Sequence, residues 1–286
     1  MRTDFLSSRE VQILLLVASY RYLGLTHLEE FLFAGSPTTR LSRKVMTRRV
    51  AGRLRDHGLL ASTPRLVGGP AGGSGRLAYH LTKLGAKLAG QLNPDLPTRR
   101  LSSSGTFLMQ HALMTADVAL AFRRAARTHP GHDILEWESD WQARHRVRSS
   151  VLVPDAYFVY ATPDLELSAF LEIDLGTEGS RFFACKILSY LELARAGDWR
   201  EIFESWPLVL VVTPTERRAE ALRRATEAVI ARQADAERIR GRTAFGFAAI
   251  GQVIEGPLDA VWHFNDTEEV QVLLPSMLAH SHEAVD

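Results

Sequence analysis

The chain contains 286 residues, of which 46% are hydrophobic and 23% are charged, and its formal net charge is +1. A chain of this length can bury two hydrophobic cores, so we expect two domains. The apolar run Val11–Ala18 is too short to cross a bilayer and no other stretch qualifies, which excludes a membrane partner. The only cysteine, Cys185, excludes an internal disulfide and indicates a reducing, cytoplasmic location.

The near-zero net charge hides a strongly basic segment. Between Arg40 and Arg65 the chain carries eight Lys or Arg residues and a single acid, Asp56. A basic segment inside a nearly neutral protein is typical of a local site for a polyanion. The alternative is an ordinary solvated helix face.

Three helices are predicted in the first 60 residues. "SSREVQILLLVASYRYLG" (7–24) opens with a serine cap and is strongly apolar, and "LTHLEEFLF" (25–33) follows it. After the break "AGSP", a third helix is expected from about Leu41 to His57, and Gly58 ends it. The expected core positions of this helix recur at helical spacing: Leu41, Val45 or Met46, Val50 and Leu54.

A glycine-tipped hairpin and a further helix follow. Strand-like pieces near 60–67 and 76–81 flank the glycine-rich tip, and "TKLGAKLAGQL" (82–92) reads as a helix. Three helices and a hairpin in this order predict a winged helix-turn-helix, whose third helix suits the DNA major groove. The alternative is a winged helix that makes only protein contacts. The hairpin would be the wing of this fold. The expected contacts to double-stranded DNA lie on or just before the third helix and at the base of the hairpin: Thr39, Arg40, Arg43, Lys44, Thr47, Arg48, Arg65 and Arg76.

The composition predicts where the domains begin and end. "NPDLPTRRLSSSG" is rich in Pro, Ser and Arg, which is typical of a linker. We therefore expect a winged-helix domain over 1–92, a linker over 93–104, a second domain over 105–275 and a flexible tail over 276–286.

The second domain is expected to be a mixed sheet flanked by helices, which makes the whole chain α+β. After a helix over 106–128, three successive strand patterns suggest an antiparallel meander, and a helix leading to "PLVLVVT" suggests a parallel addition. The remaining pieces are one long solvated helix over 215–240 and the strand "TAFGFAAI".

Three acids are expected to meet at one end of this sheet. Glu172 and Asp174 are two residues apart on an apolar strand, and Asp155 follows Pro154 in the preceding strand. Because buried like charges repel, something must compensate them, and Mg²⁺ prefers carboxylate oxygens. A bound Mg²⁺ could also activate water for phosphodiester hydrolysis. The alternative is that Glu172 and Asp174 end a strand at the solvent edge.

Lys186 and Tyr190, one turn apart on the following helix, could point back at these acids. We expect Lys186 to assist Glu172 and Asp174 in catalysis, the alternative being an ordinary surface lysine.

The arrangement resembles the PD-(D/E)XK nuclease superfamily, whose pattern is Pro-Asp followed by acid-any-Lys on the next strand. Pro154-Asp155 and Glu172-Ile173-Asp174 match it, except that Asp174 stands where the pattern has lysine. In some members the lysine has moved to the next helix, and Lys186 is the candidate replacement. Without such a replacement the site would bind metal without cutting, or be inactive.

A longer series of motifs resembles the replication-relaxation family of bacterial plasmids and other mobile elements. The motifs are "LTHLEEFLF", "LRDHGLL", "YHLTKLG", "QHALMTADV", "PDAY" and "LEIDLGTE", followed by a lysine and a tyrosine. The resemblance implies DNA handling in plasmid replication or transfer.

Two main functions remain open. One is a Mg²⁺-dependent nuclease or nickase delivered to DNA by the winged helix. The other is a non-catalytic DNA-binding regulator or accessory factor that retains the nuclease fold. An adaptor that binds no nucleic acid is a third alternative, and a second copy of the chain and other replication or transfer proteins are candidate partners.

Overall fold

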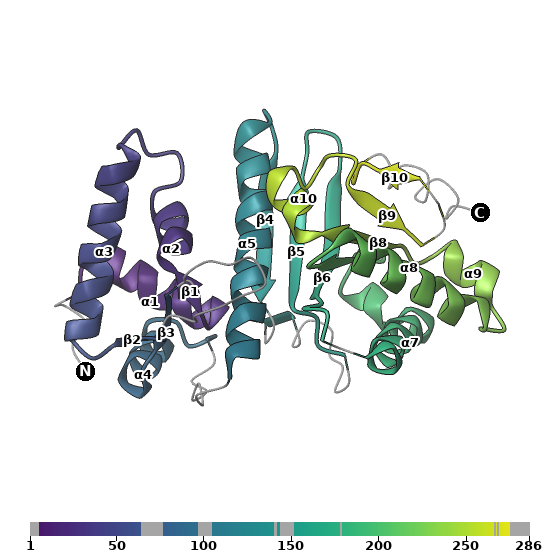
Figure 1. Cartoon of the computed structure of the whole chain (residues 1–286), viewed down its shortest axis with the longest axis horizontal. Coiled ribbons are helices and arrows are strands. Elements are labelled where there is room, and N and C mark those ends of the chain that lie inside the picture. Colours follow the sequence, from purple (N-terminus) through teal and green to yellow (C-terminus); the bar gives the residue numbers. More distant parts are fainter. Residues whose placement is uncertain are drawn as a thin grey trace. The chain divides into compact units, whose positions relative to one another are not determined.

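The computed structural model describes residues 6–63, 77–96, 105–139, 142–143, 152–177, 179–265, 267 and 269–274. The chain forms two compact units, Met1–Leu120 and Ala121–Asp286, and the division falls inside one long helix, α5 (Thr106–Thr128) (Figure 1).

The first unit consists of helices around a small antiparallel sheet with the strand order β1-β3-β2. Its elements before α5 are α1 (Ser8–Tyr20), β1 (Leu23–Gly24), α2 (Leu25–Leu32), α3 (Arg40–Asp56), β2 (Leu60–Ser62), β3 (Ala78–Leu81) and α4 (Lys83–Leu92). The three predicted helices of the N-terminal segment are all present, and the two strands that follow α3 pair with each other as the hairpin expectation required.

Side-chain caps fix the ends of these helices. Ser7 accepts the backbone N–H of Glu10, and the Glu10 carboxylate accepts the N–H and hydroxyl of Ser7, which is a capping box. The same carboxylate accepts a hydrogen bond from Arg53 Nε at 2.9 Å, so the start of α1 is tied to α3. Gly58, with φ +68°, ends α3 in a left-handed conformation that glycine adopts readily.

The first part of α5 packs in the first unit. Met109, Ala112 and Leu113 form one buried cluster with Tyr22 and Ala78. The sequence assigned residues from 105 onward to the second domain. The structure instead places 105–120 with the first unit, because these apolar side chains cover the start of the small sheet.

A buried histidine strengthens this packing. His27 Nδ1 accepts the backbone N–H of Gly24 at 3.1 Å, and its Nε2 lies 2.8 Å from Asp117 Oδ1 on α5. Because Nδ1 is an acceptor, Nε2 carries the proton that Asp117 accepts. Both ring nitrogens therefore have a structural role, since Nδ1 caps the start of α2 and Nε2 holds α2 to α5.

The second unit is a mixed seven-stranded sheet with the order β10-β9-β8-β7-β6-β5-β4. The predicted antiparallel meander and parallel addition are present, since β4, β5 and β6 pair antiparallel and β6, β7 and β8 pair parallel. The predicted α+β class is confirmed. The strands are β4 (Asp133–Ser139), β5 (Ala156–Ala161), β6 (Glu166–Ile173), β7 (Leu208–Thr213), β8 (Phe245–Ala249), β9 (Trp262–Phe264) and β10 (Val270–Gln271).

Helices cover both faces of this sheet (Figure 1). They are α7 (Ser180–Ala196), η1 (Asp198–Glu201), α8 (Glu216–Ala231), α9 (Ala236–Arg240) and α10 (Ile250–Glu255). On one face, α7 and α8 share a core with Tyr157, Phe170 and Val211. On the other face, Phe122 of α5 packs against Phe158 with tilted rings whose centroids are 4.7 Å apart. Alternate residues of β5 thus enter opposite cores, as expected for a strand covered on both faces.

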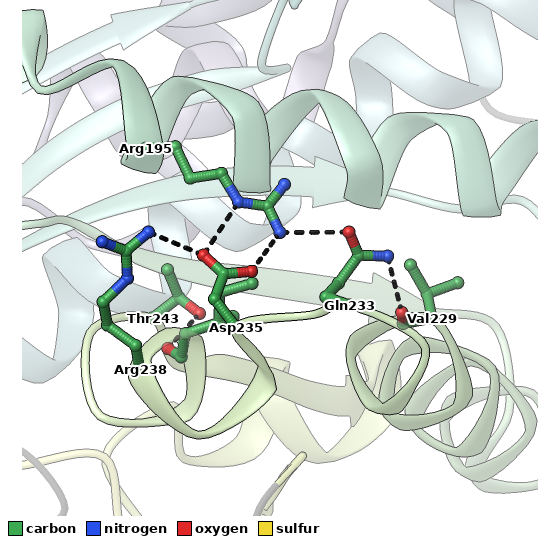
Figure 2. Close-up of polar contacts among 7 residues, drawn as sticks. Arg195, Val229, Gln233, Asp235, Arg238 and Thr243 are labelled. Atoms are coloured by element: carbon green, nitrogen blue, oxygen red, sulfur yellow. Dashed lines mark hydrogen bonds and ion pairs between the residues drawn. The ribbon is translucent and has the colours of Figure 1, made fainter.

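The predicted single helix over 215–240 is two helices joined by a short turn. Asp235, in that turn, accepts hydrogen bonds from Arg195 at the end of α7 and from Arg238 of α9 (Figure 2). Arg195 also donates to Gln233. The Arg195 guanidinium holds the pKa of the Asp235 carboxyl well below its usual range. This cluster fixes the direction change between α8 and α9.

Candidate functional site

The exposed positions of α3 present a series of cations to solvent. The residues are exposed, and within the described part of the chain they make no ion pair: Arg40, Lys44, Arg48, Arg49 and Arg55. We call this set the α3 basic face. The core side of the helix is where Val50, Ala51 and Leu54 are buried. The helix is therefore amphipathic, with concentrated positive charge on its outer surface.

The structure separates the predicted DNA-contacting residues into different groups. Arg40, Lys44 and Arg48 lie on the α3 basic face. Thr39 is exposed and caps α3 by accepting the backbone N–H of Ser42. Arg65 and Arg76 lie outside the residues that the structure describes.

Two of the predicted residues have other roles. Arg43 is half-buried, lies 3.7 Å from Glu29 of α2, and donates to the Ser36 carbonyl. Its charge is thus partly neutralised at the α2 side of the helix. The prediction for Thr47 is wrong, because Thr47 is fully buried and its hydroxyl donates to the Arg43 carbonyl at 2.9 Å. Thr47 lies three residues before Val50 and so shares the core side of α3.

Leu41 was expected in the core, as was either Val45 or Met46, and both Leu41 and Val45 are exposed. Leu41 is 73% exposed and Val45 is 47% exposed. The burial of Val50, Ala51 and Leu54 defines the inner side of the helix, and at 100° per residue Leu41 and Val45 then fall on the outer side. The helical angles of Leu41 and Val45 relative to Val50 and Leu54 already indicate exposure in the sequence. Apolar character alone does not place a residue in the core.

The predicted acids of the second unit lie at adjoining strands. The register of β5 with β6 ends where Ala156 lies opposite Leu171, and the backbone N–H of the preceding residue, Asp155, donates to the Leu171 carbonyl at 2.9 Å. Asp155 Oδ2 also accepts the backbone N–H of Ile173 at 2.7 Å. Asp155 therefore lies at the end of β6 beside Glu172, close enough for its negative charge to act on the Glu172 carboxyl.

Glu172 is buried and both of its carboxylate oxygens have partners on α7. Lys186 Nζ donates to Oε2 at 2.8 Å, and the Tyr190 hydroxyl donates to Oε1 at 2.5 Å. Burial raises the pKa of Glu172 to about 7, the charge of Lys186 opposes this increase, and the negative charge of Asp155 adds to it. The expected approach of Lys186 and Tyr190 to the acid is observed, and the alternative of Lys186 as an unattached surface lysine does not apply.

Asp174 has a separate partner that the sequence did not reveal. Arg218 of α8 donates to both Asp174 oxygens, through Nε at 2.7 Å and through a terminal nitrogen at 3.0 Å. Asp174 is 3% exposed and also accepts the backbone N–H of Gly176. This bidentate pair closes the carboxyl end of β6 onto α8.

The arrangement does not fit a magnesium site built from three carboxylates. Within the described ranges, no group of three or more His, Cys, Asp or Glu side chains is placed to hold a metal ion. Lys186 and Arg218 supply positive charge to Glu172 and Asp174, the compensation that the sequence assigned to a divalent cation. A metal shared by Asp155, Glu172 and Asp174 stays a prediction, and in the structure Asp174 is held by Arg218.

Comparison with known proteins gives one family. The family model described as replication-relaxation matches residues 14–205, about two thirds of the chain. The chain belongs to the replication-relaxation family. The resemblance drawn from the sequence motifs is thereby confirmed. Neither the curated proteins nor the solved structures include a match to the chain.

The replication-relaxation match covers both candidate sites. It begins inside α1, includes α3, and extends past Asp155, Glu172, Lys186 and Tyr190 to the segment after η1. Arg218 lies beyond its end. Membership associates the chain with DNA replication. Among the described residues, every helix is too short or too polar to cross a membrane.

Proposed function

We propose that this replication-relaxation protein binds double-stranded DNA through the α3 basic face and acts in the replication or transfer of a plasmid or other mobile element. The observation that carries the proposal is the concentration of Arg40, Lys44, Arg48, Arg49 and Arg55 on the exposed side of a single helix. These cations have no acidic partner among the described residues, so their charge is available to an external polyanion.

The first unit has the order expected of a winged helix-turn-helix, with α3 as its recognition helix. An α-helix fits the major groove, and cations along its outer side would neutralise phosphates on both groove edges. Each phosphate contact releases condensed counterions, so binding should weaken as salt rises. The protein would act in the cytosol, and a second copy or other replication or transfer proteins are further proposed partners.

We propose that the second unit is a PD-(D/E)XK-like fold that serves as a scaffold without cutting DNA. This is supported by the state of its acids, since Glu172 is neutralised by Lys186 and Asp174 by Arg218. Carboxylates held in this way offer few free oxygens to a hard cation.

The DNA-binding proposal is tested by single substitutions on the α3 basic face. Lys44→Ala and Arg48→Ala should each weaken binding to a duplex and reduce the slope of log affinity against log salt by about 1, because each removes one phosphate contact. Fluorescence anisotropy over a salt series measures both quantities. Lys87→Ala is the matched control, because Lys87 is an exposed cation of the same unit on α4. Equal losses from all three substitutions, or binding independent of salt, would contradict the proposal.

A second candidate function is Mg²⁺-dependent cleavage or nicking of DNA. It is favoured by the proximity of Asp155, Glu172 and Lys186 at the end of β6, as in the nuclease pattern. Supercoiled plasmid incubated with the protein and magnesium chloride would report it. Nicked or linear product that disappears with both Asp155→Asn and Glu172→Gln would establish cleavage and overturn the scaffold proposal. Intact plasmid with the wild-type protein supports the scaffold.

A further inference from the structure

The α3 basic face surrounds two exposed apolar side chains that its charge does not explain. Leu41 is 73% exposed and Val45 is 47% exposed. They lie one helical turn apart, and Arg40, Lys44 and Arg48 repeat at the same four-residue spacing beside them. An apolar pair is therefore set among cations that form no ion pair with any described residue.

The surrounding charges restrict what could cover this apolar pair. A partner must offer negative charge at the edges of the contact and small apolar groups between them. The major groove of DNA has this combination, because phosphates line its edges and the C5-methyl groups of thymine project from its floor. Another protein surface would need a dense acidic patch to satisfy the same cations.

The spacing along α3 is compatible with neighbouring bases. Residues four apart on a helix have Cβ atoms about 6 Å apart. Successive bases on one strand are separated by about 3.4 Å along the axis, so two such side chains reach bases one or two steps apart.

We propose that Leu41 and Val45 contact thymine methyl groups and thereby give α3 a preference for thymine-containing sites. The proposal rests on DNA binding by α3 and adds the basis of its sequence selectivity. In this arrangement Arg40, Lys44 and Arg48 hold the backbone and position the helix, whereas the two apolar side chains distinguish bases.

Replacing thymine by uracil tests this directly, because it removes only the C5-methyl group. The full-length protein is first used to select duplexes about two helical turns long from a random library. The enriched duplex is then compared with versions carrying uracil at single thymine positions. We expect about 4-fold weaker binding for each contacted methyl that is removed. Uracil outside the protected region should have no effect.

Substitutions assign the effect to the two side chains. In the double variant Leu41→Ala, Val45→Ala the uracil penalty should disappear, with salt dependence retained. Leu84→Ala is the matched control, because Leu84 is 41% exposed on α4 of the same unit, and it should keep the full penalty. Because all three residues are exposed, the variants should fold normally, which circular dichroism would check.

The possible outcomes distinguish the thymine contact from the DNA-binding proposal on which it rests. Equal binding of thymine and uracil duplexes, a penalty that persists in the double variant, or selection without any enriched sequence would overturn the thymine contact and leave salt-dependent DNA binding intact. Loss of self-association in the double variant, with the uracil penalty unchanged, would assign the apolar pair to a second copy of the chain and likewise overturn it. A wild-type protein that binds no duplex would overturn both.

Discussion

Glu172 is a buried carboxylate, and its environment should make folding sensitive to pH. Burial raises its pKa from 4.5 to about 7, so between these values the folded protein holds a proton that the unfolded chain has lost. The free energy of unfolding should therefore fall as pH rises through this interval, by on the order of 3 kcal/mol from this residue.

Glu172→Gln should remove that part of the decline, because glutamine does not titrate. Urea denaturation of the wild type and the variant at about pH 5 and pH 7.5 would measure it. Parallel pH profiles for the two proteins would show that Glu172 is ionised throughout the range.

Asp174 illustrates a different dependence on a single neighbour. Removing Arg218 would leave a carboxylate that is 3% exposed without its bidentate partner. We expect Arg218→Leu to lower the free energy of unfolding by about 3 kcal/mol. Arg224→Leu, on the same helix but with a side chain 76% exposed, should cost less than about 1 kcal/mol. If Asp174→Asn fails to recover part of the Arg218→Leu loss, the ion pair is not the source of the effect.

The residues on which the acidic site depends show where sequence reasoning reaches its limit. The sequence indicated that Asp155, Glu172 and Lys186 lie close together. The alternation of side chains along the strands places the two acids, and Lys186 lies on the helix that directly follows. Arg218 was not found, because it lies 44 residues after Asp174 on a helix that looked uniformly solvated. Nothing local distinguishes it from the other arginines of α8, and only the packing of α8 against the end of β6 selects it.

At the scale of elements, α4 depends on a close approach that only glycine permits. A Cβ atom at Gly85 would lie 2.0 Å from the Leu59 carbonyl oxygen. Gly85→Ala should therefore force α4 away from the end of α3 and cost about 1–3 kcal/mol in the free energy of unfolding.

Gly52→Ala provides the opposite case within the same unit. Gly52 lies inside α3, and a Cβ there would meet nothing within 4 Å. Alanine should stabilise the helix by about 0.5–1 kcal/mol. Thermal unfolding followed by circular dichroism would compare the two variants, and similar shifts in the same direction would contradict the close-approach argument.

The elements that sequence patterns predicted are those long enough to show a period. The helices α1, α3, α5 and α7 and the strands β5 to β8 have eight or more residues or nearly continuous apolar runs. The strands β1, β9 and β10 have two or three residues each, and α10 has six. Such short pieces carry no readable periodicity, and the three strands form because β3, β8 and β9 offer them an edge.

At the scale of the whole molecule, positive and negative charge balance in number but are used differently. The second unit pairs its buried acids with its own cations, whereas the α3 basic face has no such partners in the described part of the chain.

Under the scaffold proposal, magnesium chloride in place of EDTA should not change the melting temperature, because no three-carboxylate group is available among the described residues. A rise in melting temperature that Asp155→Asn abolishes would show that the acids do bind the metal.

The limits of the two units also differ from those that composition predicted. The proline- and serine-rich segment 93–104 marked a linker, yet the division lies within α5. The helix α5 is continuous and has apolar positions along its whole length. Its sequence therefore does not indicate where packing in the first unit ends and packing in the second unit begins.

The hydrogen bond between Tyr190 and Glu172 has a spectroscopic consequence. Burial and the adjacent carboxylate raise the pKa of Tyr190 well above that of a free phenol, and burial raises the pKa of Tyr160 to about 12. Of the six tyrosines, these two should stay un-ionised during alkaline titration until the second unit opens. The ultraviolet band of tyrosinate would then grow in a late step that coincides with loss of the sheet, making two native chromophores reporters of its unfolding.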